Sequence, residues 1–424
     1  MQTFPESPLK SVSRILFGPA DVLFAADWKA SKVHAFQLPA PAGELDGKYF
    51  NIKDLEAQIR QGADLGEIAL EDITARPGSN EVYVSVSIGV QKEPAIFVAT
   101  ADGAVRRLPL ESLASTSAEL DAPPDDMAMF WRTIPVRSFT VTDMAWRDGK
   151  LYAAGVSNQA FASTLRVLPY PFGSGTNTVT SVEIYHAAHG QVETRAPMRA
   201  MTFIDIDGEP HMLCGYLCTP IVTIPLKQIE DGAHITGKTI MELAVGGYPV
   251  ALIPIAIENF QTGEAESNVL AINRWRHSFS ISMASIKKAH AAGGLSVPTK
   301  DGSKIVISGG EGLEGISELN VATVFAASDQ GGELVVALRR DLQTGRVEVV
   351  SYNKSGMIRL SDMDVEEYWW RDWQPRTPQD SWISGTFNYA RLNEGYPDLV
   401  QEYEQPAGGD MPGGDMPGAD VTAK

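Results

Sequence analysis

The sequence has very few cysteines. Only Cys214 and Cys218 occur among its 424 residues, which excludes a disulfide-rich scaffold and a zinc ribbon built from four thiolates. Their surroundings, HMLCGYLCTPIVTIPL, predict a strand. Residues four apart in a strand lie roughly 13 Å apart, beyond the ~7 Å between Cα atoms that a disulfide tolerates. We therefore expect two small buried hydrophobic side chains, with the alternative that one of them is a metal ligand or a reactive thiol.

Long apolar runs and a surplus of positive charge are also missing. The longest uncharged apolar stretch, residues 245–257, is shorter than the ~20 residues that a spanning helix needs, so no transmembrane segment is expected. The balance of 35 Lys and Arg against 53 Asp and Glu leaves a net charge of −18. Such a surface repels phosphate backbones, so nucleic acid is not an expected partner.

The N-terminal residues MQTFPESPLKSVSR contain no apolar segment of the kind found in a secretory signal. Met1 is also compatible with a start codon placed before an already trimmed mature chain. Two localisations therefore stay open: periplasmic or secreted if the chain is a trimmed form, and cytoplasmic otherwise.

What the sequence does contain is a weak repeat, in which an apolar stretch leads into a turn and then into a strand rich in β-branched or aromatic residues. The dipeptides at 148–149 and 207–208 are Asp-Gly turns of this kind, and Asp-Gly between apolar stretches is typical of a β-hairpin. Six such units begin near Ser13, Asp72, Asp143, Arg199, Tyr248 and Ser317. The pattern predicts an all-β protein of repeated antiparallel sheets.

The segments LFGPADVLFAADWKASKVHAF, ARPGSNEVYVSV and AWRDGKLYAAG carry this repeat most clearly. They resemble β-propellers of the quinoprotein amine dehydrogenase, YVTN and NHL kind. The resemblance implies a single propeller over residues 13–400, with seven blades as the favoured number although six units are visible. The seventh would be assembled from about residues 350–400 and the N-terminal strand.

The remaining segments are predicted to lie outside the blades. Residues 1–12 are expected to be an N-terminal extension, and short surface helices are expected within 51–66 and 280–294. Residues 401–424 repeat Gly, Asp, Met and Pro and have almost nothing to bury, so this tail is expected to be disordered.

Histidines in one part of the chain are the first candidate metal ligands. His186, His189 and His211 fall within 26 residues, and Glu193 follows the first pair. In a strand His186 and His189 would point to opposite faces, whereas a turn brings both imidazoles to one side. If the chain turns there, the four side chains form a nitrogen and oxygen set suited to a first-row transition metal. The alternative is that the histidines of this loop face solvent.

Arginine and tryptophan side chains mark two candidate ligand-binding segments. The first consists of Arg274, Trp275 and Arg276. It is predicted to form a cationic wall at the mouth of the propeller channel that is able to hold an anion. The second consists of Trp369, Trp370 and Trp373. It is predicted to line a binding groove, because Trp and Arg carry a large share of recognition energy. For both segments, packing at a strand end or between blades is the alternative.

No motif for a catalytic nucleophile or an attached haem is present. The favoured hypothesis is therefore a non-catalytic propeller that binds a protein or a small ligand through its loops and axial channel. The alternative is a metal-assisted enzyme or an oxidoreductase subunit, with a site at the channel mouth around His186, His189 and His211. The only cofactor that the sequence suggests is a first-row transition metal.

Overall fold

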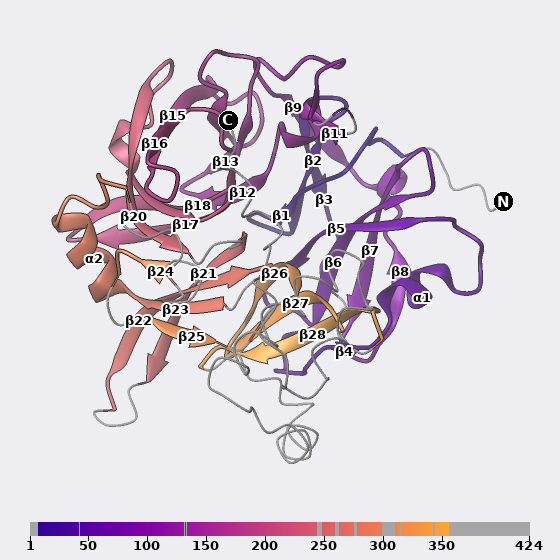
Figure 1. Cartoon of the computed structure of the whole chain (residues 1–424). Helices are drawn as coiled ribbons and strands as arrows, with labels where there is room; N and C mark the ends of the chain where they lie inside the picture. The colour runs from indigo at the N-terminus through magenta and orange to yellow at the C-terminus, as the bar shows by residue number, and fades with distance from the viewer. Residues whose placement is uncertain are drawn as a thin grey trace, which may run out of the picture.

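Antiparallel strands account for most of the structure. The computed structural model describes residues 7–355 apart from short internal gaps. These gaps are residues 42, 131, 133, 244–247, 259–262, 275–277, 299–309, 314–315, 320, 322 and 342–343. The expected all-β class is confirmed: the fold is a β-propeller, with antiparallel sheets arranged around a central axis (Figure 1).

The first half of the chain forms three groups of four strands, each written here from the innermost to the outermost strand. Sheet 1 contains β1 (Ile15–Phe17), β2 (Val22–Asp27), β3 (Lys32–Gln37) and β9 (Ser115–Glu119). Sheet 2 contains β5 (Ile68–Ala75), β6 (Glu81–Ile88), β7 (Glu93–Thr100) and β8 (Val105–Arg107). Sheet 3 contains β12 (Asp143–Arg147), β13 (Lys150–Val156), β14 (Ser163–Pro169) and β15 (Thr178–His186).

The second half of the described chain forms three further groups. Sheet 4 contains β17 (Met198–Ile206), β18 (Glu209–Tyr216), β19 (Pro220–Pro225) and β20 (His234–Leu243). Sheet 5 contains β21 (Pro249–Glu258), β22 (Ala265–Asn273), β23 (Ser278–Ser282) and β25 (Ser317–Leu319). Sheet 6 contains β26 (Val324–Gly331), β27 (Leu334–Arg340), β28 (Val347–Asn353) and β4 (Asn51–Ile52).

Sheets 3 and 4 are fused into one ten-stranded sheet. Their outermost strands, β15 and β20, pair in parallel, with Ser181 opposite His234 and Ile184 opposite Gly237. Two short strands extend its margins, β16 (Gln191–Glu193) on β15 and β24 (Gly310–Glu311) on β20. A separate two-stranded sheet consists of β10 (Met129–Phe130) and β11 (Ile134–Pro135). The fusion brings the outer edges of two neighbouring sheets into direct contact.

The Asp-Gly turns are hairpins, as predicted. Asp148 and Gly149 connect β12 to β13, and Asp207 and Gly208 connect β17 to β18. All four residues have positive φ, at 50° and 75° in the first turn and 54° and 83° in the second. Two successive positive φ values match the right-handed twist of the flanking strands and favour Asp or Asn followed by Gly. These turns are therefore determined locally by the sequence.

The sheets pack face to face around the axis through six separate hydrophobic clusters. Each cluster joins two neighbouring sheets, in the closed order 1, 2, 6, 5, 4, 3 and back to 1. The innermost strands contact one another in the same order, from β1 through β5, β26, β21, β17 and β12 (Figure 1). The ring therefore closes through six sheets in the described part of the chain, one fewer than the seven expected.

The ring closes because an early segment completes the last sheet. β4 pairs with β28, with Ile52 opposite Val349, so the outermost strand of sheet 6 comes from near the N-terminus. The amide of Phe50 also donates to the hydroxyl of Ser351 at 2.8 Å. Pairing of distant chain segments was expected, but it involves residues 51–52. Residues 356–424, which include most of the expected seventh blade and the expected disordered tail, lie outside the described residues.

Helices are short and lie beside the sheets. α1 (Leu55–Arg60) is capped by Asp54, whose carboxylate accepts the Ala57 amide at 2.9 Å, and α2 (Met283–Ala291) is capped by Ser282. Three 3₁₀ turns span Leu110–Ser112, Val136–Phe139 and Leu226–Gln228. No helix of the described residues is long and apolar enough to cross a membrane.

The segment before β1 contributes to the core. Leu9 and Val12, which the sequence placed in an N-terminal extension, are buried in the cluster between sheets 1 and 2. The hydroxyl of Ser11 and the amide of Lys10 both donate to the buried carboxylate of Asp27. The described part of the extension is thus packed onto the propeller.

Candidate metal site

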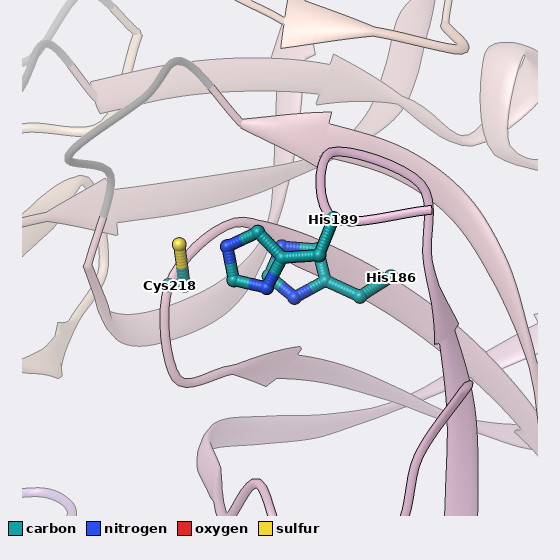
Figure 2. A group of neighbouring side chains, drawn as sticks. All are labelled: His186, His189 and Cys218. Atoms are coloured by element: carbon teal, nitrogen blue, oxygen red, sulfur yellow. The ribbon is translucent and has the colours of Figure 1, made fainter. Parts of the chain in front are cut away.

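The candidate site forms where the outer edge of sheet 3 turns back on itself. His186 is the last residue of β15, and the amide of His189 donates to the carbonyl of His186 at 3.1 Å. Gly190 follows with a φ of 64°, a conformation that glycine adopts without steric cost. The chain then returns as β16, with Gln191 opposite His186. This tight turn brings both imidazoles to the same side, as the turn alternative predicted (Figure 2).

Glu193 connects the two histidines. One carboxylate oxygen of Glu193, Oε1, lies 2.9 Å from Nδ1 of His186 and 2.8 Å from Nδ1 of His189. The ring centroids of the two histidines are 3.9 Å apart, with 39° between the ring planes. His186 is completely buried, whereas the side chain of His189 is 49% exposed. The cluster is therefore buried at His186 and open to solvent at His189.

Cys218 completes the cluster from the neighbouring sheet. It lies in the turn between β18 and β19 and has a φ of 78°, which is unusual for a residue other than glycine. Its sulfur, one nitrogen of His186 and one nitrogen of His189 all lie within 4.8 Å of one another. Figure 2 shows the thiol beside the two imidazoles. For Cys218 this geometry favours the alternative interpretation of the cysteines, in which one of them is a metal ligand.

A second carboxylate supports the cluster from the buried side. Glu242, on β20, is completely buried and accepts the Ala187 amide at 2.7 Å and the hydroxyl of Thr219. Nε2 of His186 lies 3.0 Å from the Thr219 hydroxyl and 3.6 Å from Glu242 Oε2. Sequence reasoning missed Glu242, because it lies 56 residues after His186 and reaches the site only through the parallel pairing of β15 with β20.

The charges around His186 favour its protonated form in the metal-free protein. Burial lowers the pKa of His186, but the contacts with Cys218 and Glu193 and the charge of Glu242 outweigh burial and raise it to about 10. Burial raises the pKa of Glu193, but its hydrogen bonds with His186 and His189 dominate and hold it well below its usual range. Burial also raises the pKa of Glu242. A cation at this position is therefore already stabilised by two carboxylates.

The donor atoms fit a first-row transition metal. Two imidazole nitrogens, a thiolate and a carboxylate oxygen are the ligands that Zn²⁺ and its neighbours accept. In a tetrahedral site with bonds of ~2.0–2.3 Å the donors lie roughly 3.3–3.8 Å apart, so donors that are at most 4.8 Å apart need to approach one another by no more than about 1.0–1.5 Å. The half-exposed His189 leaves a path for the ion. Such a metal would replace the proton on His186 and the proton on Cys218.

His211 does not join this cluster. It lies near the start of β18, opposite Pro225 of β19, while Thr219 and Cys218 precede the other end of β19. Six residues of a strand separate Thr219 from Pro225, a distance of roughly 20 Å. Nδ1 of His211 lies 2.9 Å from the Glu209 carbonyl, and its ring packs against His290 at 4.9 Å between centroids. Of the four proposed ligands, the structure brings together His186, His189 and Glu193.

The site also differs in position from the one expected. β15, β16 and β20 are outer strands, so the cluster lies at the rim between sheets 3 and 4 and away from the axial channel. Arg274 alone of the proposed ligand-binding residues is described, and its guanidinium carbon lies 5.0 Å from the ring centroid of Phe325. The others lie outside the described residues: Trp275, Arg276, Trp369, Trp370 and Trp373.

No protein-family model and no curated protein matches this chain. Among solved structures it is similar to the PQQ-bound form of aldose sugar dehydrogenase from Streptomyces coelicolor (10% identity, TM-score 0.29, covering 81% of this chain and 94% of that chain). It is also similar to Drosophila Semaphorin 1a extracellular domains 1–2 (8%, 0.35, 83% and 88%) and to Kuenenia stuttgartiensis hydrazine synthase (11%, 0.31, 82% and 97%). At these TM-scores none of the similarities bears on what this chain binds.

Proposed function

We propose that this β-propeller is a binding protein whose rim site takes up a first-row transition metal, with Zn²⁺ as the simplest occupant. The observation that carries the proposal is the convergence of His186, His189 and Cys218 from two sheets, with donor atoms within 4.8 Å of one another. Glu193 supplies a fourth donor, since its oxygen lies within 3 Å of a nitrogen of each histidine. The proposed relationship to quinoprotein amine dehydrogenase, YVTN and NHL propellers concerns architecture only.

The residues around the three ligands would help the propeller to bind the metal tightly. Glu242 and Thr219 orient His186 from behind, and carboxylates that hold a ligating imidazole typically strengthen a metal site. The ligands come from β15, the turn before β16, β16 itself and the turn after β18. A bound metal would therefore cross-link sheets 3 and 4 at their outer edges and stabilise the folded state.

Metal titration of the chelator-treated, reduced protein tests the proposal. We expect one Zn²⁺ per chain by isothermal titration calorimetry, and with Co²⁺ a thiolate-to-cobalt charge-transfer band. His189→Ala and Cys218→Ser should each weaken binding by more than about a hundredfold, since changes outside the first ligand shell already cost about 10–100-fold. Cys218→Ser should also abolish the charge-transfer band.

Two matched substitutions serve as controls. His211→Ala and Cys214→Ala remove the same side-chain types from the next sheet but leave the cluster intact, so both should bind Zn²⁺ with unchanged stoichiometry and affinity. The proposal is wrong if the wild-type chain takes up no stoichiometric metal, or if the controls lose as much affinity as the site variants.

A metal-assisted enzyme is the second candidate, and one observation favours it. In this candidate His186, His189 and Cys218 are the three protein ligands, and Glu193 orients the two imidazoles instead of ligating the metal. The solvent-exposed side of His189 then leaves the fourth position to a water molecule, which is the feature that distinguishes catalytic from structural zinc sites. This candidate predicts an activity that chelation removes and that Zn²⁺ restores in the wild type and in His211→Ala, but not in Cys218→Ser.

A further inference from the structure

The axial channel contains a second group of charged side chains, separate from the rim site. Between the innermost strands lies a cavity of about 110 Å³. It is lined from all six sheets, by residues that include Ile15, Asp72, Asp143, Met201, Val250 and Ala327. The innermost strands of all six sheets thus contribute residues to one small cavity.

Three arginines gather at the end of this channel where β17, β21 and β26 begin. The guanidinium carbon of Arg199 lies 4.9 Å from the ring centroid of Tyr248. The guanidinium carbons of Arg274 and Arg340 lie 5.0 and 5.2 Å from the ring centroid of Phe325. Guanidinium groups that stack on aromatic rings keep their N–H edges directed sideways, where they suit planar oxyanions.

Backbone hydrogen bonds connect two of these arginines, Arg274 and Arg340. The Arg274 amide donates to the Tyr248 carbonyl at 2.9 Å, the Thr323 amide to the Arg274 carbonyl at 3.0 Å, and the Arg340 amide to the Thr323 carbonyl at 3.0 Å. This series connects sheet 5 to sheet 6 at the channel end. The arginines are therefore anchored on rigid strand ends, and their convergence follows from the closed ring.

Positive charge exceeds negative charge at this end. Burial, with the neighbouring charges of Arg14 and Arg274, lowers the pKa of Arg199 to about 10. Of the two carboxylates that line the cavity, Asp72 is engaged by Arg14 at 3.1 Å, and Asp143 accepts the Met201 amide. In a protein of net charge −18, these cations concentrate a local positive potential at this end of the ring.

Arg199 supplies the most specific observation. Its Nε is buried and has no hydrogen-bond partner in the part of the chain that the structure describes. A buried guanidinium N–H without an acceptor is costly, and a bound oxyanion would satisfy it. We propose that the channel end formed by Arg199, Arg274 and Arg340 binds a small oxyanion, a carboxylate or phosphate, whose oxygens accept from the guanidinium groups.

Titration with simple anions tests this site without reference to the rim metal. Chelator-treated protein is titrated with inorganic phosphate and, separately, with succinate in a low-salt buffer, which distinguishes a phosphate ligand from a carboxylate ligand. We expect saturable 1:1 binding of at least one of them. Arg199→Gln should weaken it about tenfold or more, because hydrogen bonds to charged groups are among the stronger ones.

Arg147→Gln is the matched control. Arg147 also stacks on an aromatic ring, Phe203, at 5.4 Å, but it lies at the other end of β12 and pairs with Asp148. This variant removes the same charge and should leave anion affinity unchanged. Arg340→Gln is the second test variant and should weaken binding in the same direction. Saturable binding by neither anion, or equal losses in Arg147→Gln and Arg199→Gln, would overturn the proposal. Unfolding midpoints measured for every variant verify that each is folded.

Discussion

Replacing His186 by glutamine in the metal-free protein should remove a stabilising contribution that depends on pH. His186 is completely buried and contacts Glu193 at 2.9 Å and Glu242 at 3.6 Å, and these surroundings raise its pKa to about 10. A histidine in the unfolded chain has a pKa of about 6.5. The folded state therefore binds the proton more tightly than the unfolded state does, and protonation of His186 favours folding.

The sign and size of the effect follow from this difference. The contribution is fully present below about pH 6.5 and is lost as the pH rises through about 10, because the folded state loses its extra proton there. Each pKa unit corresponds to about 1.4 kcal/mol, so a shift of three to four units gives at most about 5 kcal/mol. The same charge pair also accounts for the lowered pKa of Glu193, so the two shifts are not added.

Guanidinium denaturation at pH 6, 8 and 10, with a chelator and a reductant present, measures the effect. The difference in the free energy of unfolding between wild type and His186→Gln should be largest at pH 6 and shrink toward pH 10. Glu242→Gln removes one charge that raises the pKa of His186 and should reduce the trend. A difference that is constant across this pH range would refute the reasoning.

Two further predictions concern the cysteines and a buried arginine. Burial raises the pKa of the Cys214 thiol, whereas Cys218 is partly exposed, so iodoacetamide should modify Cys218 alone, and Zn²⁺ should slow the modification. Peptide mass spectrometry measures both, and equal labelling of the two thiols would contradict the site geometry. Arg166 is fully buried and donates to the carbonyls of Asp121, Thr140 and Val156 at 2.9–3.1 Å. Arg166→Met leaves these acceptors unsatisfied and should lower the free energy of unfolding by about 3–5 kcal/mol; a loss under about 1 kcal/mol in chemical denaturation would argue against their importance.

Local signals in the sequence predicted the two Asp-Gly hairpins and the all-β fold class correctly. Asp148-Gly149 and Asp207-Gly208 form turns with two positive φ values because Gly and Asp tolerate that backbone conformation, and no distant contact is needed. The number of sheets could not be predicted in the same way. The strand that completes sheet 6 is only two residues long, Asn51–Ile52, and a strand this short carries no recognisable pattern.

Part of the candidate site was also predictable, because some of its residues are close together in the sequence. His186, His189 and Glu193 lie within eight residues, so one tight turn is sufficient to bring them together. His211 was close in sequence but lies on a strand that carries it away, because extended chain advances by ~3.3 Å per residue. Cys218 and Glu242 reach His186 from sheet 4, and no spacing along the chain indicates that approach.

By itself the sequence determined the all-β class, the positions of the tight turns and the net negative charge, because each depends on residues close together in the chain or on composition alone. Tertiary structure decided where the ring closes, which histidines share a carboxylate, and which arginines meet at the channel. Those outcomes depend on the parallel pairing of β15 with β20 and on the packing of six sheets around one axis. Such contacts join residues that are tens to hundreds of positions apart, so only the folded chain brings their side chains together.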